Sequence, residues 1–264
     1  MLVGVIHLPP LPGSPRAPLG KGLEKVLEGV RRDALALSRA RYDAIIVENF
    51  GDAPFFADRV PPVTVSAMTL CVAAANEAAS GVPIGVNVLR NDAESALSIA
   101  AVTGSAFIRV NIHSGARVTD QGTIQSRAAE TLRLRSGLGV KDVAIWADVD
   151  VKHSSPLGTT TRESVLQETH DVVERGLASA VLVTGDGTGV APDESKLAGI
   201  KKAAGRAKVF IASGATVENM ASFAAHADGI IVGSALRRGG KAGGPVDPAR
   251  AKAFASAYRS TFRR

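Results

Sequence analysis

The residues with the clearest chemical potential lie in residues 143–157, which read VAIWADVDVKHSSPL. Asp148, Asp150 and Lys152 occupy alternate positions after an apolar run, and alternate side chains of a strand project from the same face. We therefore expect two carboxylates and an amine on one face, with His153 on the other. An unpaired charge taken out of water costs several kcal/mol or shifts its pKa until it neutralises. This crowding predicts a binding or catalytic site; the alternative is a salt-bridged strand end that only closes a turn.

Two kinds of carbonyl chemistry suit Lys152. A lysine that is buried, or that lies near a second cation such as Arg109, has a lowered pKa and can form a Schiff base with a carbonyl compound. A lysine paired with Asp148 or Asp150 stays charged and can stabilise an enolate. Both routes lead to proton transfer next to a carbonyl, as in isomerases, lyases and aldolases, and the sequence leaves both open.

Polar residues also end the other apolar runs of strand type. Because the carboxyl ends of barrel strands meet at one mouth, we expect these side chains to converge there. The predicted catalytic residues are Glu48, Asn111, Asp148, Asp150, Lys152 and His153. The predicted substrate-binding residues are His7, Asn87, Arg109, Thr184 and Gly185. His7 and His153 are proton-shuttle candidates because an unperturbed histidine has a pKa near 6.5, and a hydrogen-bonded structural role is the alternative for each.

Short apolar runs alternate eight times with segments of helical period along the 264 residues. A chain of about 250 residues with this alternation is typical of a (β/α)8 TIM barrel, which we predict as a single domain over residues 1–264. A doubly wound open sheet would place a glycine-rich phosphate loop after its first strand. This chain has PPLPGSP there, and its later GDGTG does not match the dinucleotide fingerprint.

Two short turns predict a phosphate site. SGAT follows the seventh strand and GSAL the eighth, where TIM barrels commonly bind phosphate. Glycine lets the backbone approach an anion, and amides that open a helix direct hydrogens and partial positive charge at it. The predicted phosphate-binding residues are Ser213, Gly214, Ala215, Gly233 and Ser234. Ordinary helix caps are the alternative.

Several long strings resemble the BtpA family: GVIHLPPLPGSP, VENFGDAPF, RVNIHSGARVTDQG, DVKHSSPL and GATVENM followed by ADGIIVGSALR. Together they extend over essentially the full chain. The resemblance implies a phosphate-binding TIM barrel. It also implies a second class of function, because the founding member is associated with accumulation of photosystem I. A non-catalytic biogenesis, assembly or stability factor is therefore the alternative to an enzyme.

Composition and charge limit the classes of molecule that we expect this protein to bind. The formal charge is +6, yet basic residues are scattered and aromatic residues make up 4% of the chain, so we expect a small phosphorylated metabolite rather than nucleic acid. With no run of about 18 apolar residues and no signal-peptide pattern, we expect a cytoplasmic protein without a membrane span. Cys71 lies in an apolar stretch and predicts a packed thiol. Glu48, Asp148 and Asp150 offer oxygen ligands for Mg2+ or Mn2+, and a homo-oligomer is expected.

Overall fold

The computed structural model describes residues 1–18, 22–185 and 193–262. Eight parallel strands close into a barrel in the order β1-β11-β10-β9-β7-β4-β3-β2, with β1 also paired to β2. The barrel strands are β1 Leu2–His7, β2 Ala44–Glu48, β3 Ile84–Asn87, β4 Phe107–Val110, β7 Ala144–Val149, β9 Ala180–Val183, β10 Lys208–Ile211 and β11 Gly229–Val232. The predicted TIM barrel is confirmed, and the open doubly wound sheet is not formed.

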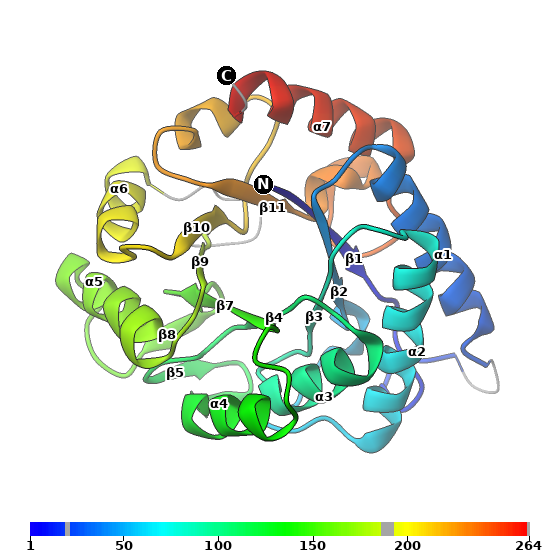
Figure 1. Ribbon diagram of the computed structural model, residues 1–264, viewed down its shortest axis with the longest axis horizontal. Helices are drawn as coiled ribbons and strands as arrows, with labels where there is room; N and C mark the ends of the chain where they lie inside the picture. Colours follow the sequence, from blue (N-terminus) through cyan, green and yellow to red (C-terminus); the bar gives the residue numbers. More distant parts are fainter. Residues whose placement is uncertain (19–21, 186–192, 263–264) are drawn as a thin grey trace.

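Helices surround this barrel as an outer ring (Figure 1). They are α1 Glu24–Arg39, α2 Pro62–Ala78, α3 Ala93–Thr103, α4 Ala128–Gly137, α5 Arg162–His170, α6 Glu194–Ala203 and α7 Pro248–Phe262. Helix α5 continues into a π-helical turn, Asp171–Arg175. The helix predicted after SGAT is absent from the described residues: a single 3₁₀ turn, η3 Met220–Phe223, stands in its place between β10 and β11.

Apolar side chains fill the barrel interior. Phe107 stacks on Trp146 with ring centroids 3.7 Å apart, and Trp146 stacks on Phe210 at 4.9 Å. Gly85 faces the same interior, where a Cβ atom would collide with the Phe107 ring, so this position of β3 requires glycine. A second and larger apolar cluster packs between the strands and the helices and contains the buried Cys71. The barrel interior is therefore filled by packed aromatic and aliphatic side chains.

Two segments depart from the minimal barrel on the β4 and β7 sides. The polar stretch after β4 forms a hairpin of β5 Ala116–Thr119 and β6 Gly122–Gln125. The short strand β8 Ser154–Pro156, which follows β7, pairs antiparallel with β5 to complete a three-stranded sheet. This sheet connects the loop that carries Lys152 to the loop after β4.

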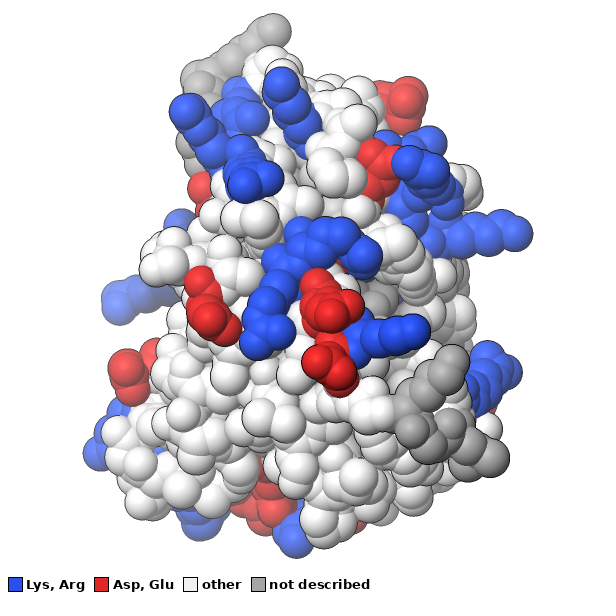
Figure 2. All heavy atoms as spheres, turned by 90° about the vertical axis from the view of Figure 1, so that its right-hand side faces the viewer, with Lys and Arg blue, Asp and Glu red and all other residues white. Residues whose placement is uncertain are grey.

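The exterior is charged but mixed. On the side shown in Figure 2, Lys and Arg are interspersed with Asp, Glu and neutral side chains. Within the described parts of the chain, no helix is both long enough and apolar enough to span a bilayer.

Candidate active site

The polar residues at the carboxyl ends of the strands continue the inward-facing pattern of the barrel core. Two residues after an inward apolar side chain, the same strand places a polar one in the same direction. These pairs are Val5 and His7, Ile46 and Glu48, Phe107 and Arg109, and Trp146 and Asp148. Asn87 follows Gly85 in the same way. A layer of buried polar groups thus lies directly above the packed rings.

Hydrogen bonds join this layer around Asp148. Arg109 donates to both oxygens of Asp148, from Nη2 at 3.0 Å and from Nε at 3.1 Å, and Asn111 Nδ2 donates to the same carboxylate at 2.6 Å. Asn87 Nδ2 donates to Glu48 Oε2 at 2.6 Å, while Arg109 Nη1 lies 3.8 Å from that oxygen. All of these side chains are buried. The two carboxylates are therefore compensated inside the layer.

Lys152 lies at the edge of the layer without such a partner. Among the described residues its Nζ makes no hydrogen bond or ion pair, although Glu48 and Asp148 are near enough to act on its charge. Burial lowers the pKa of Lys152, and the charge of Arg109 lowers it further against the opposing effect of the two carboxylates. The loop backbone is fixed because Lys152 N donates to Thr184 Oγ1 at 3.0 Å. This amine is consequently closer to its neutral form than an exposed lysine.

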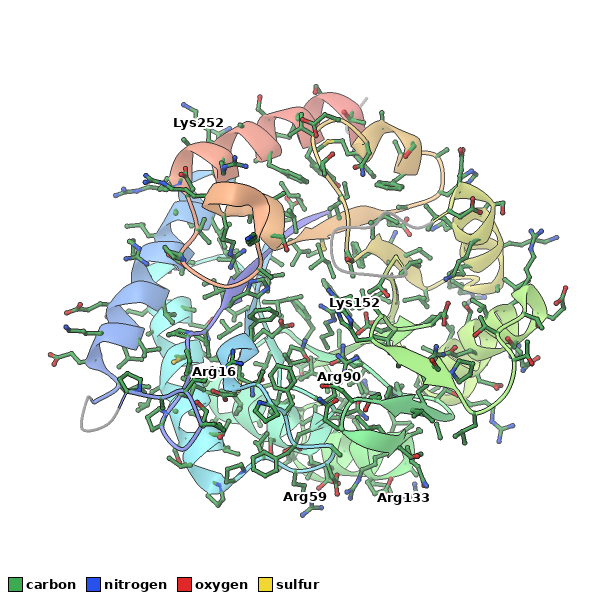
Figure 3. All side chains as sticks on the ribbon, turned by 180° about the vertical axis from the view of Figure 1, so that it is seen from behind. Arg16, Arg59, Arg90, Arg133, Lys152 and Lys252 are labelled. Atoms are coloured by element: carbon green, nitrogen blue, oxygen red, sulfur yellow. The ribbon has the colours of Figure 1, made fainter. Side chains whose placement is uncertain are left out.

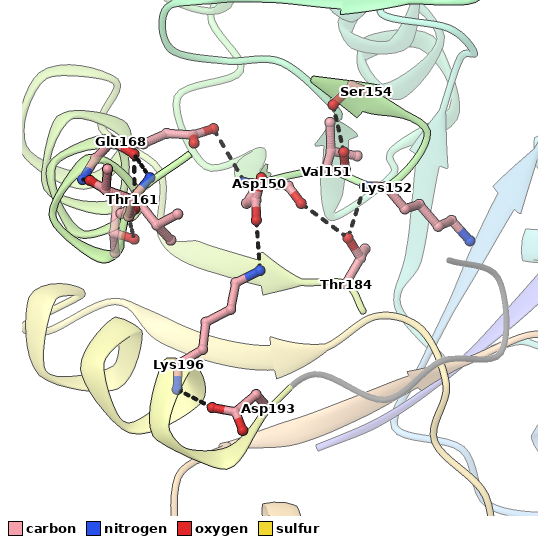
Figure 4. Close-up of polar contacts among 12 residues, drawn as sticks. Asp150, Val151, Lys152, Ser154, Thr161, Glu168, Thr184, Asp193 and Lys196 are labelled. Carbon is pink, nitrogen blue, oxygen red and sulfur yellow. Dashed lines mark hydrogen bonds and ion pairs between the residues drawn. The ribbon is translucent and has the colours of Figure 1, made fainter. Parts of the chain in front are cut away.

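Asp150 does not join this site, and the prediction that it shares a face with Asp148 and Lys152 is wrong. Strand β7 ends at Val149, and Asp150 has a φ of 46°, which breaks the two-residue alternation. Its carboxylate instead accepts a hydrogen bond from Lys196 Nζ at 2.6 Å (Figure 4). It also accepts one from Arg117 Nη2 at 2.6 Å. Burial alone would raise the pKa of Asp150, but Lys196 and Arg117 outweigh it and lower the pKa. Asp150 anchors the Lys152 loop from outside the mouth.

The two histidine candidates both line the same cavity as Lys152. His7 Nδ1 accepts the Gly243 amide at 3.0 Å, and its Nε2 lies 3.8 Å from Glu48 Oε1. Burial, with the charges of Arg237 and Lys152, lowers the pKa of His7 well below its usual value. The expectation that His153 points away from Lys152 is also wrong, since a φ of 58° turns this residue to the cavity. Burial and the charge of Lys152 lower the pKa of His153 as well.

Thr184 and Gly185 are buried at the end of β9 and do not contribute to the cavity wall. Thr184 Oγ1 accepts the Lys152 amide and lies 3.5 Å from the Asp150 carbonyl oxygen. Thr184 therefore contacts the loop that carries Lys152. The rest of the GDGTG sequence lies outside the described residues.

The cavity has a volume of about 960 Å³ and opens at the carboxyl ends of the strands. Besides Lys152, its wall contains both glycine-containing turns together with Arg16 and Arg250. All five predicted phosphate-binding residues line it: Ser213, Gly214, Ala215, Gly233 and Ser234. The two turns therefore face one shared space.

The local form of these turns differs from the prediction. Neither opens an α-helix directly: the first leads to η3, and the second is a 3₁₀ turn, η4 Ser234–Leu236. Gly214 has a φ of 76°, which favours glycine, whereas the φ of Gly233 is −121°. At Gly233 the constraint is space, because a Cβ would lie 3.0 Å from the His7 ring. Backbone amides, rather than the amino terminus of an α-helix, are the groups available to an anion.

The three carboxylates predicted as metal ligands are not brought together. Asp150 lies outside the mouth, Asp148 is saturated by Arg109 and Asn111, and Glu48 is held by Asn87. Among the described residues, no group of three or more His, Cys, Asp or Glu side chains is arranged to hold a metal. Of the three carboxylates, only Glu48 and Asp148 belong to the polar layer, and Mg2+ or Mn2+ binding stays a prediction.

Arg90 and Arg117 are two residues that strand periodicity did not identify. Arg90, in the loop after β3, lines the cavity and donates from Nη2 to the Lys152 carbonyl oxygen at 2.9 Å. Arg117 lies on β5 and holds Asp150. Arg90 could have been predicted from the sequence as a site residue because it lies just beyond the end of β3. Nothing in the sequence pointed to Arg117, because its partner is set by the packing of the β5–β6 hairpin.

Sequence comparison gives the relationship of the whole chain. A family model described as the BtpA family matches residues 1–260. The chain belongs to the BtpA family. It is 46% identical over 256 residues to the photosystem I biogenesis protein BtpA of Synechocystis, covering 97% of this chain and 87% of that protein. It is also 41% identical over 251 residues to an uncharacterized protein of Pyrococcus furiosus, covering 95% and 92% of the two chains.

Solved structures similar to this BtpA-family chain are TIM barrels. KGPDC from Streptococcus mutans matches with a TM-score of 0.60 and 14% identity, covering 99% of this chain and 98% of that chain. N-(5'-phosphoribosyl)anthranilate isomerase from Pyrococcus furiosus matches with a TM-score of 0.57 and 16% identity, covering 98% and 99%. At this level of identity the likeness shows the fold.

Proposed function

We propose that this BtpA-family chain is an enzyme that acts on a small phosphorylated sugar or sugar-like metabolite by proton transfer next to a carbonyl. The observation that carries the proposal is that one cavity is lined both by a lysine amine and by two glycine-containing turns. Lys152, whose amine has no ion pair among the described residues, follows β7, and the turns at Gly214 and Gly233 follow β10 and β11. A phosphate would bind the turns while the carbonyl reaches the amine.

The environment of Lys152 favours the Schiff-base version of this chemistry. A neutral amine attacks a carbonyl carbon, the carbonyl oxygen takes up protons and leaves as water with one net proton drawn from solvent, and the resulting cationic imine acidifies the adjacent C–H bond. Burial and Arg109 both favour the neutral amine. His153, whose pKa is lowered by burial and by Lys152, is able to accept the released proton. The product class is then that of an isomerase, a lyase or an aldolase.

Borohydride trapping tests this proposal. The protein would be incubated with a panel of aldose and ketose phosphates, reduced, digested and analysed by mass spectrometry. We expect an adduct on Lys152 for a compound that turns over, and no adduct in Lys152→Met. A substrate that turns over without an adduct would remove the Schiff-base version. If no phosphorylated compound binds or turns over, the substrate class is wrong.

A non-catalytic role is the second candidate, supported by the 46% identity to the Synechocystis photosystem I biogenesis protein. In that case the cavity would serve at most to sense a metabolite. Complementation of a Synechocystis strain that lacks its own BtpA distinguishes the two roles. Full rescue by both wild type and Lys152→Met would support an assembly or stability factor, whereas rescue by wild type alone would connect the biological role to the cavity.

A further inference from the structure

Arg90 is a buried cation without a carboxylate partner among the described residues. The residue is 7% exposed, and its Nε is buried with no hydrogen-bond partner there. Among the described residues, its one side-chain hydrogen bond runs from Nη2 to the Lys152 carbonyl oxygen at 2.9 Å. Leaving a guanidinium nitrogen both dry and unpaired is costly, because folding has removed the water that would otherwise solvate it.

Arg109 provides the contrast within the same cavity wall. Its guanidinium is satisfied by Asp148 at two points and has Glu48 nearby. No carboxylate among the described residues pairs with Arg90 in this way. Burial lowers the pKa of Arg90, although the nearby charge of Asp148 acts in the opposite direction. Two neighbouring cations, Arg90 and Lys152, therefore face the cavity without the compensation that Arg109 receives.

The unsatisfied groups extend beyond Arg90. Asn111 is 3% exposed, lines the same cavity, and has an Oδ1 without a hydrogen-bond partner among the described residues; as an acceptor, this oxygen suits a substrate hydroxyl group rather than an oxyanion. In Figure 3, Lys152 and Arg90 lie inside the ring of helices, whereas Arg59, Arg133 and Lys252 lie at its periphery. Arg90 and Lys152 thus line the same cavity as the Gly214 and Gly233 turns.

We propose that Arg90 binds a second oxyanion of the substrate, next to the carbonyl carbon on which Lys152 acts and separate from the phosphate at the Gly214 and Gly233 turns. The substrate class is then a phosphorylated carbonyl compound with a further anionic group, a carboxylate or a second phosphate. Both satisfy a guanidinium by charge-assisted hydrogen bonds. This inference rests on the proposed function for the place of the carbonyl, but its test needs no turnover.

Site-resolved acylation measures the oxyanion site directly. The full-length protein would be treated briefly with acetic anhydride at increasing acetate or inorganic phosphate, and Lys152 modification quantified by mass spectrometry against exposed Lys252 in the same sample. An anion at Arg90 shields Lys152 and raises its pKa, and each unit of increase lowers the neutral fraction about tenfold. We expect a saturable slowing at Lys152 only, by about tenfold or more.

Four variants locate the effect. Arg90→Gln should abolish the slowing, and Arg90→Lys should keep part of it because the charge remains. Exposed Arg133→Gln is the matched control and should behave as wild type. Gly214→Val removes the phosphate turn, so phosphate that still slows Lys152 in this variant is bound at Arg90. Slowing by acetate alone indicates a carboxylate, and slowing by phosphate in Gly214→Val indicates a second phosphate.

The outcomes separate the two proposals. If neither anion slows Lys152 in the wild-type protein, or if Arg90→Gln with an unchanged thermal melt retains the full effect, the Arg90 site is overturned. If Gly214→Val binds phosphate as tightly as wild type while the Arg90 results hold, the phosphate-turn part of the proposed function fails and the oxyanion site stands.

Discussion

The Arg109 guanidinium holds the Asp148 carboxylate at two points, with Nη2 3.0 Å from one oxygen and Nε 3.1 Å from the other. Asn111 supplies a third donor at 2.6 Å, so the hydrogen bonds of this buried carboxylate come from Arg109 and Asn111 and not from Lys152. The ion pair thereby has two effects. It stabilises the polar layer, and it leaves the amine of Lys152 available to a ligand.

Replacing Asp148 by asparagine should destabilise the protein strongly. The change removes the charge that compensates buried Arg109, and breaking one side of a buried pair typically costs about 3–5 kcal/mol. Urea unfolding of Asp148→Asn would measure the loss. Asp58→Asn is the control, because Asp58 is exposed in its ion pair with Arg127, and we expect a change of about 0–1 kcal/mol. Equal losses in the two variants would contradict the assigned role of Asp148.

Stability should depend on the protonation of Glu168. Burial raises the pKa of Glu168 to about 7 from 4.5, against the opposing charge of Arg117 and the Asp150 amide. The folded state then holds a proton that the unfolded state releases between pH 4.5 and 7, so this contribution is complete below pH 4.5 and is lost as pH rises to about 7. The groups facing Glu168 are Arg117 on β5, Asp150 in the β7–β8 loop and Lys196 on α6.

Comparison with Glu168→Gln isolates this contribution from those of the other titratable groups. The wild-type free energy of unfolding should fall relative to the variant as pH rises through this window, by up to about 3 kcal/mol. Urea unfolding of both proteins at several pH values provides the comparison. Parallel curves would show that Glu168 is ionised throughout and that the Arg117 and Lys196 charges dominate its environment.

Gly214→Val should weaken the binding of inorganic phosphate by about tenfold or more, because a β-branched residue is strained at a φ of 76° and fills space near the turn. Ser234→Ala should have little effect, since the backbone amides remain. Calorimetry gives the affinities, and a cooperative thermal melt is required of each variant. A folded Gly214→Val protein with wild-type affinity would place the phosphate elsewhere.

Chelation decides the metal prediction. Since Asp148 and Glu48 are already held by Arg109 and Asn87, we expect EDTA treatment to leave phosphosugar turnover unchanged. Activity would be measured after dialysis against the chelator and again after addition of Mg2+ or Mn2+. Loss with EDTA that either ion restores would mean that a metal displaces these hydrogen bonds in the working enzyme.

The sequence by itself determined the barrel and the direction of its regular strand residues. Strand-type runs and helical periods alternate throughout, and a closed parallel barrel buries every such run. Within β4 and β7, the two-residue period was enough to bring Arg109 and Asp148 to the same interior, because regular strand geometry extends to both positions. The same reasoning applies to His7 and Glu48.

The tertiary structure alone decided where the two-residue alternation of each strand ends and which groups surround each charged side chain. Asp150 lies one residue beyond β7, where a φ of 46° redirects its side chain to Arg117 and Lys196, contacts made by two elements distant in sequence. Arg90 lies in a loop, whose side-chain directions no periodicity specifies, so its approach to Lys152 emerged only from the packed structure. Local geometry follows from local sequence, whereas the compensation of a buried charge depends on every element packed around it.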